Sequence, residues 1–163
     1  MVRSAQDRMT WICTSEPPTA RLRLADPPSS RAMLDGGWWP TSRDPVVELS
    51  SLITALAARG DGVIERVMLP PAAWDSHPTR IGVGGTVVRV GWFATLDAER
   101  VILTGTRNLR IDLAVTAPHT GDVAATAAMH AASHLADTTR IAAWETEGGH
   151  LRPDRHPTAP VRA

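Results

Sequence analysis

The chain has 163 residues, of which 43% are hydrophobic and 21% charged, a composition typical of one globular domain. Its 17 basic and 17 acidic residues give a formal net charge of zero, which argues against a nucleic-acid-binding protein because such proteins carry a basic excess. The single cysteine, Cys13, excludes an internal disulfide, and with no signal-peptide pattern or membrane-length apolar run we expect a cytoplasmic protein without a membrane partner.

The N-terminal region, residues 1–19, shows no periodic pattern and ends in two prolines, which predicts a flexible arm. Within this arm, Trp11 and Ile12 are candidates for docking onto the domain. Residues 21–24 alternate polar and apolar side chains, a pattern that predicts a short strand. The segment 34–44 contains two adjacent glycines and two adjacent tryptophans, and we predict it to be a loop.

A helix is predicted over residues 45–59. Asp44 is a favourable N-cap, because its side chain accepts backbone N–H bonds, and Pro45 suits the first helical position. Gly60 fits the position just past the end of the helix. Apolar residues recur at helical spacing, namely Val46, Leu49, Leu52, Ile53 and Leu56.

Between Gly62 and Thr116 the pattern changes to that of strands. The predicted strands cover residues 63–69, 81–83, 86–90, 101–103 and 109–115. Gly84 and Gly85 tolerate positive φ, so they predict a two-residue hairpin turn. The loop between the last two strands is predicted to be a hairpin with Asn108 in the left-handed conformation.

An alanine-rich helix is predicted over residues 122–136, followed by a helical piece near 138–147 and a disordered tail over 149–163. A single domain is therefore expected over residues 20–148. The order of strand, helix, consecutive strands and helix predicts an α+β fold. In that fold an antiparallel β-meander sheet of five to six strands is packed on one face by two to three helices.

The predicted strand register places arginines together on the outer face of the sheet. The hairpin turn pairs Arg80 with Arg89, and matching Trp92 to Val101 then puts Arg89 beside Thr104. The outer row reads Arg80, Arg89, Thr104 and Arg110, with Phe93 and Arg100 in a neighbouring row. One interpretation is a solvated face on which arginine stems cover apolar surface. The other is a surface for an anion or an acidic partner, built from Arg80, Arg89 and Arg110.

The two tryptophan-containing segments suggest a second candidate site. A packing interpretation puts one of the adjacent tryptophans into the end of the core, because large aromatic side chains stabilise mainly through buried area. A binding interpretation has an exposed tryptophan stack on a ligand, provided that the two segments meet at one end of the sheet. The residues of this candidate binding site are Asp35, Trp38, Trp39, Arg43, Trp74 and Arg80.

These patterns favour a non-enzymatic binding or regulatory domain whose partner is a small molecule or a protein. One alternative is a small enzyme with Asp35 or His77 as acid or base, although no complete catalytic constellation is present. Another is an arginine-faced sheet that binds an acidic protein or nucleic acid. His130 and His134 have the spacing of a helical metal site, but no glutamate follows His130, and we predict no metal and no other cofactor.

The string Leu-Asp-Gly-Gly-Trp-Trp-Pro at residues 34–40 resembles a family of uncharacterised small proteins, a domain of unknown function of high-GC Gram-positive bacteria. The residues that carry the resemblance are this string, Ser42-Arg43-Asp44, Glu48-Leu49, Ala73-Trp74, Pro78, Arg80-Ile81, Val88–Phe93 and Ala128-Met129. Thr41 stands where arginine is expected. The likeness covers about residues 20–136 and implies the domain boundaries, but no activity, cofactor or partner.

Overall fold

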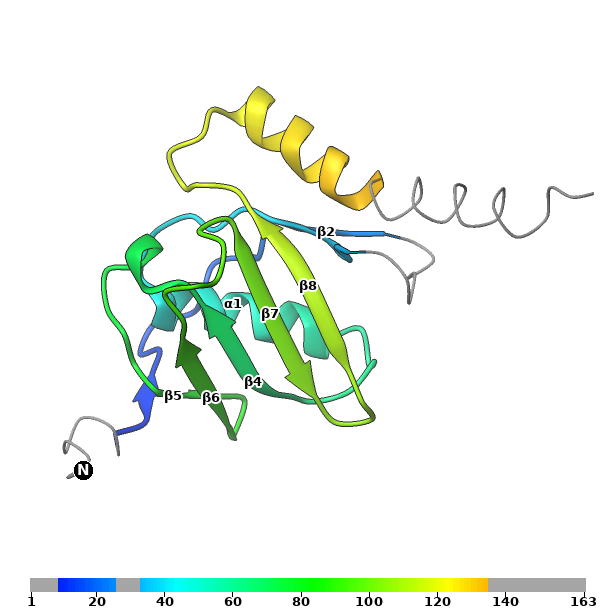
Figure 1. Cartoon of the computed structure of the whole chain (residues 1–163). Coiled ribbons are helices and arrows are strands. Elements are labelled where there is room, and N and C mark those ends of the chain that lie inside the picture. The colour runs from blue at the N-terminus through cyan, green and yellow to red at the C-terminus, as the bar shows by residue number, and fades with distance from the viewer. Residues whose placement is uncertain (1–8, 26–32, 135–163) are drawn as a thin grey trace, which may run out of the picture.

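Figure 1 shows the computed structural model, which describes residues 9–25 and 33–134 of the chain. Its helices are α1 (Pro45–Ala57), the short 3₁₀ helix η2 (Pro71–Ala73) and a helix over residues 122–134. Its strands are β1 (Trp11–Ile12), β2 (Leu22–Leu24), β3 (Gly36–Trp38), β4 (Ile64–Leu69), β5 (Arg80–Val83), β6 (Thr86–Trp92), β7 (Arg100–Gly105) and β8 (Arg110–Val115). The helical piece predicted near 138–147 and the tail over 149–163 lie outside the described residues.

All eight of these strands belong to one mixed sheet, in the order β1-β5-β6-β4-β7-β8-β3-β2. The pairs β1/β5, β4/β6 and β3/β8 are parallel, and the other neighbouring pairs are antiparallel. The predicted antiparallel meander of five to six strands is therefore wrong in both strand number and strand direction. Side-chain periodicity identifies strands, but it does not say which strands pair.

The central position of β4 accounts for much of this difference. Val67 of β4 lies opposite Val90 of β6 on one side and opposite Leu103 of β7 on the other. The predicted match of Trp92 with Val101 is wrong because β4 separates those two strands. β4 and β6 run parallel, and a parallel pair needs a long connection between its strands. Here that connection includes β5, through which the chain passes before it enters β6.

The helix α1 covers the inner face of the sheet and closes the core. The buried apolar side chains of α1 are Leu49, Leu52, Ile53 and Leu56. They share one cluster with inward-facing residues of six strands, including Val67, Ile81, Val88, Val101, Leu113 and Trp38. Full burial of one such side chain contributes about 1.5–3 kcal/mol, so this face is the main source of stability.

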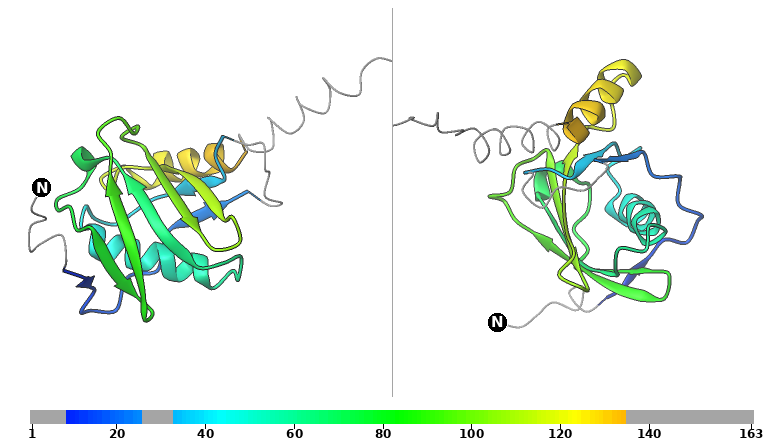
Figure 2. Two further views of the ribbon diagram at one scale, coloured as in Figure 1. Left: turned by 60° about the horizontal axis from the view of Figure 1, so that its bottom comes forward. Right: turned by 90° about the vertical axis from the view of Figure 1, so that its right-hand side faces the viewer.

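The helix over residues 122–134 lies on the opposite face of β3 from α1. Trp38 shares the core cluster with Leu49 of α1. Its neighbour Gly37 faces the other way, because successive residues of a strand point to opposite sides, and a Cβ on Gly37 would lie 3.0 Å from Cα of Met129. The right-hand view of Figure 2 shows β2 and β3 between the two helices. The prediction that the helices pack on one face is therefore wrong.

The glycine–tryptophan segment is a buried strand, although its composition predicts a loop. A Cβ on Gly36 would overlap the carbonyl oxygen of Arg23 in β2, so only glycine lets the two backbones approach this closely. Gly37 gives the same access to the helix over residues 122–134, since a Cβ there would lie 3.2 Å from Cβ of Ala132. Gly36 therefore serves the close approach of β2 along the edge of β3, and Gly37 the close approach of the helix on one face.

Local signals in the sequence are confirmed where they act over a few residues. The Asp44 side chain accepts the N–H of Val46 at 3.0 Å and caps α1. Gly84 and Gly85 have φ values of 56° and 79° at the turn between β5 and β6, and Asn108 has a φ of 56°. No helix in the described part of the chain is long and apolar enough to cross a bilayer.

We expect Gly36→Ala to lower the free energy of unfolding by about 3 kcal/mol, because the added methyl group meets backbone atoms that move only if β2 shifts. Gly121→Ala is the matched control, since a Cβ there meets nothing within 4 Å, and its cost should stay below about 1 kcal/mol. Urea denaturation of both variants measures the difference. Equal losses in the two variants would contradict the close-approach explanation.

Candidate functional site

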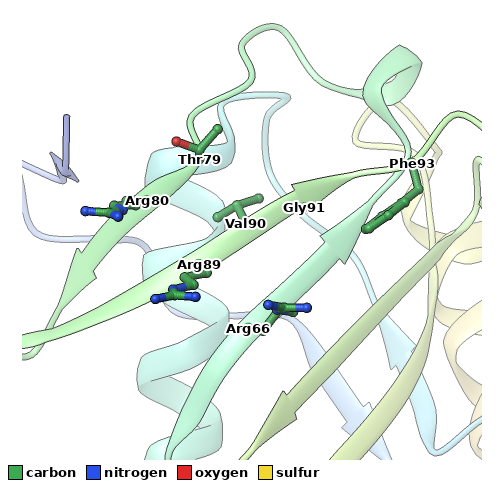
Figure 3. Close-up of a pocket in the computed structure, with 7 residues that line it drawn as sticks. All are labelled: Arg66, Thr79, Arg80, Arg89, Val90, Gly91 and Phe93. Atoms are coloured by element: carbon green, nitrogen blue, oxygen red, sulfur yellow. The ribbon is translucent and has the colours of Figure 1, made fainter. Parts of the chain in front are cut away.

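The outer face of the sheet, opposite α1, carries a hollow of about 410 Å³ (Figure 3). We call it the arginine hollow, and its lining residues are Arg66, Thr79, Arg80, Arg89, Val90, Gly91 and Phe93. They come from β4, β5 and β6 and from the residues just before β5 and just after β6. A rigid sheet therefore holds most of this site.

Three adjacent strands place the arginines side by side. Arg89 of β6 lies opposite Arg80 of β5 on one side and opposite Arg66 of β4 on the other. Thr104 of β7 follows on the far side of Arg66, and Arg110 of β8 follows Thr104. The predicted pairs of Arg80 with Arg89 and of Thr104 with Arg110 are confirmed. The predicted neighbours Arg89 and Thr104 are separated by β4, so that expectation is wrong.

The arginines of the hollow differ from Arg110 in their charge partners. Among the residues that the structure describes, Arg66, Arg80 and Arg89 make no ion pair and no side-chain hydrogen bond. Arg110 donates from Nε to Oδ2 of Asp112 at 2.8 Å and from Nη2 to Oδ1 at 3.2 Å. The arginine hollow thus concentrates positive charge that no described carboxylate neutralises.

Phe93 forms one end of the arginine hollow. Its backbone N–H donates to the carbonyl oxygen of Leu69 at 2.9 Å, which fixes the residue at the end of β4. A Cβ on Gly91 would lie 2.7 Å from Cε2 of the Phe93 ring, so the ring occupies space that only glycine leaves open. Phe93 remains 47% exposed. The hollow therefore combines cationic groups with an accessible aromatic ring.

Sequence reasoning missed Arg66 as a member of this site. The alternation in residues 63–69 already places Arg66 on the side opposite the buried Val67. What was missing was the position of β4 next to β6, which no local pattern predicts. Phe93 was expected in a neighbouring outer row, but its contact with Gly91 depends on how the chain leaves β6.

The two tryptophan segments do meet, but they meet inside the protein. The rings of Trp38 and Trp74 stack with centroids 5.7 Å apart and planes 21° apart. Trp38 is 0% exposed and Trp74 is 7% exposed. Arg43 accompanies this stack, since its carbonyl oxygen accepts the N–H of Asp75 at 3.0 Å. The stack joins the end of β3 to the segment after β4.

Trp39 is also packed, beneath Arg21. The Arg21 guanidinium lies 3.4 Å from the centre of the Trp39 ring, and Nε of Arg21 donates to the Trp39 carbonyl oxygen at 2.9 Å. The hollow lined by Arg43 and Trp74 measures about 70 Å³, room for about two water molecules. Arg80 lies apart from this group, in the arginine hollow. The binding role predicted for the tryptophans stays a prediction.

Asp35 links the chain before β3 to β8. Its Oδ2 accepts the backbone N–H of Asp112 at 2.8 Å, and its own N–H donates to the carbonyl oxygen of Asp112 at 2.7 Å. Burial raises the pKa of Asp35, and the negative charge of Asp112 adds to the rise, while the hydrogen bond from Asp112 and the charge of Arg110 oppose it. These two hydrogen bonds give Asp35 a structural role, which is to join the start of β3 to β8.

His77, the other acid–base candidate, contacts the start of the 3₁₀ helix η2. Its Nε2 is 2.8 Å from the carbonyl oxygen of Pro71, so this nitrogen carries the proton and donates. The ring meets Trp92 edge-on, with centroids 4.7 Å apart. These two contacts hold the loop after η2 against the end of β6.

His130 and His134 lie together on the exposed side of their helix, with Nε2 atoms 3.0 Å apart. The described residues contain no group of three or more histidine, cysteine, aspartate or glutamate side chains placed to hold a metal ion. A further hollow of about 440 Å³ lies between the end of α1 and the two hairpin tips, and its lining is mostly apolar. Neither feature gathers unpaired charge as the arginine hollow does.

Glu48 is a buried carboxylate that sequence reasoning did not single out, and it is 2% exposed. Its Oε2 accepts the N–H of Thr41 at 3.0 Å, and its Oε1 accepts the hydroxyls of Thr41 and Ser42 at 2.5 Å and 2.9 Å. These bonds fasten the segment between β3 and α1 to the helix. The sequence carried no such signal, because the capping box has its acidic residue at the third helical position, which is Val47 here, and not at the fourth.

The raised pKa of Asp35 predicts how stability changes with pH. A carboxyl whose pKa is higher in the folded than in the unfolded chain stabilises the folded state most when the pH is below the ordinary pKa of 3.8. That contribution to stability is lost as the pH rises through the pKa of the folded state. Asp35→Asn keeps an oxygen that accepts the Asp112 N–H without the charge. Its stability relative to wild type should therefore increase as the pH rises from 3.8 and then level off.

Urea denaturation at several pH values measures this difference. Asp35→Ala is the control, because it removes both the charge and the acceptor and should be less stable than Asp35→Asn at every pH. A constant difference between wild type and Asp35→Asn across this range would contradict the raised pKa.

Loss of the Glu48 carboxylate should destabilise the fold strongly. We expect Glu48→Ala to cost about 3 kcal/mol, because three donors lose a charged acceptor. Glu48→Gln should cost less, since one amide oxygen can still accept from the two hydroxyls. The exposed Glu65→Gln is the control and should change stability by less than about 0.5 kcal/mol. Thermal and urea unfolding test this order, and equal effects at the two positions would contradict it.

Comparison with known proteins gives one match. Residues 21–132 match the model described as "Family of unknown function (DUF5994)", and this range contains every residue that lines the arginine hollow. No curated protein and no solved structure matches the chain. The expectation of a domain of unknown function is therefore confirmed: the chain belongs to this family, DUF5994.

Proposed function

We propose that this protein is a binding domain for a small ligand with several negative charges, such as a chain of phosphate groups, and that the arginine hollow is its site. In this proposal the domain acts in the cytoplasm and has a regulatory rather than a catalytic role. The observation that carries the proposal is the row of Arg66, Arg89 and Arg80 without a described charge partner.

The electrostatic cost of the row supports a functional explanation. Like charges directly opposite each other on neighbouring strands are destabilising, and Arg89 faces an arginine on each side. A bound anion offsets this repulsion and accepts charge-assisted hydrogen bonds from the guanidinium groups. Arginine suits this task, because its planar group presents several donors to phosphate or carboxylate oxygens.

The size of the arginine hollow and the charge of the chain favour a small ligand. A volume of about 410 Å³ is within the range of sites for small molecules. The formal net charge of zero gives the protein no general attraction for long polyanions. The basic surface is local, since Arg110, the next arginine in the row, is already paired with Asp112. The alternatives of an acidic protein or nucleic acid therefore have less support.

The variant Arg89→Gln tests the proposal. It should weaken binding of tripolyphosphate at least about tenfold, because a charge-assisted contact of about 1.5–3 kcal/mol is lost. It should also stabilise the free protein by a few tenths of a kcal/mol at low salt, since the repulsion on both sides of position 89 is relieved. Isothermal titration calorimetry measures the first effect and urea denaturation the second.

Arg110→Gln is the matched control, because Arg110 lies in the same row but is paired with Asp112. It should leave tripolyphosphate binding within about twofold of wild type, and binding by wild type should weaken as salt is added. Absence of tripolyphosphate binding at low salt, or equal losses in the two variants, would rule out the arginine hollow as an anion site.

A further inference from the structure

The arginine hollow carries an aromatic side chain as well as charge, and this combination narrows the class of ligand. Building on the proposed function, we infer that the ligand is a nucleoside di- or triphosphate. Its phosphates lie on the arginine row, and its base stacks on the ring of Phe93.

The face of β6 arranges the two parts of such a ligand in order. Arg89 and Gly91 are two residues apart and face the same side of the sheet, and Phe93 follows at the same spacing just past the strand. Gly91 has no side chain, so the Phe93 ring lies over it and comes close to the arginine row. Figure 3 shows the ring pointing from the end of β6 back toward Arg66. One hollow therefore presents cationic groups and an aromatic ring next to each other along the strand.

Among the exposed large apolar side chains of the described residues, Phe93 is the one that lines the arginine hollow. The ring is 47% exposed, although a location on the inner face would bury it with the core cluster. The hydrogen bond from its N–H to Leu69 already holds the backbone in place. Little backbone entropy is therefore lost when a ligand binds to the ring. Bases stack on aromatic rings of this kind without any need for sequence-specific contacts.

The width of the arginine row favours more than one phosphate group. Arg80, Arg89 and Arg66 stand on three neighbouring strands, so the row extends over two strand spacings, about 10 Å. Several phosphate groups in a chain spread their negative charge over a similar length, so a di- or triphosphate matches this row better than a single phosphate does. One nucleotide, rather than a strand of several, fits because Arg66 is the last arginine of the row without a partner among the described residues, and the hollow is confined to three strands.

The decisive experiment compares ligands with and without a base. Isothermal titration calorimetry on the full chain at low salt gives dissociation constants for tripolyphosphate, ATP and GTP. ATP or GTP should bind roughly 5- to 100-fold more tightly than tripolyphosphate, the advantage expected from one base–aromatic stack. Phe93→Leu should abolish most of this advantage, because it lowers the affinity for ATP or GTP far more than the affinity for tripolyphosphate. Phe93→Trp should keep it, because the indole is also a flat ring.

A second variant tests the geometry without removing the ring. Gly91→Ala places a methyl group where the ring now lies, and the ring is displaced because it is the freer partner. This variant should lower the affinity for ATP or GTP more than the affinity for tripolyphosphate. Circular dichroism and urea denaturation confirm that the three variants at Phe93 and Gly91 are folded before binding is compared.

The outcomes separate this inference from the proposed function. If the nucleotides bind no better than tripolyphosphate, or if Phe93→Leu leaves their advantage intact, the nucleoside assignment is wrong although the anion site stands. If single-stranded oligonucleotides bind far more tightly than ATP and GTP, a mononucleotide is the wrong class. If Arg89→Gln changes the affinity for none of these ligands, the proposed function fails as well.

Discussion

Strand β4 is hydrogen-bonded along both of its edges, to β6 in parallel and to β7 in antiparallel orientation. Its inward side chain Val67 is completely buried at the centre of the core. Because neighbouring residues of a strand face opposite sides, this arrangement forces Arg66 outward, beside Arg89. The pairing that completes the core therefore also completes the arginine row, and neither can change its register without the other.

The second constraint is the close packing of β3 against β2 and against the helix over residues 122–134. Gly36 permits the approach of β2 along the edge and Gly37 the approach of the helix on one face, and Trp38 then fills the end of the core. The stack of Trp38 on Trp74 joins β3 to the segment between β4 and β5. Since that segment leads directly into Arg80, the buried tryptophans support the arginine hollow without lining it.

The parts of the fold that depend on neighbouring residues could be predicted from the sequence. The Asp44 cap predicted where α1 begins, and the Gly84–Gly85 turn fixed the register that pairs Arg80 with Arg89. The order of the strands could not be predicted, because a connection such as residues 93–99 is long enough either to turn back directly or to pass β4. The hairpin was enough to predict that Arg80 and Arg89 lie side by side. The position of Arg66 beside them could be predicted only with the strand order.

Both edges of the sheet are formed by very short strands, β1 with two residues and β2 with three. A long exposed edge offers a row of unpaired N–H and C=O groups to which another chain can add as a further strand. In this sheet the longer strands β5 and β8 both have neighbours on each side. The two short outer strands thus limit self-association through the sheet edges, and the broad face that carries the arginines stays available to a ligand.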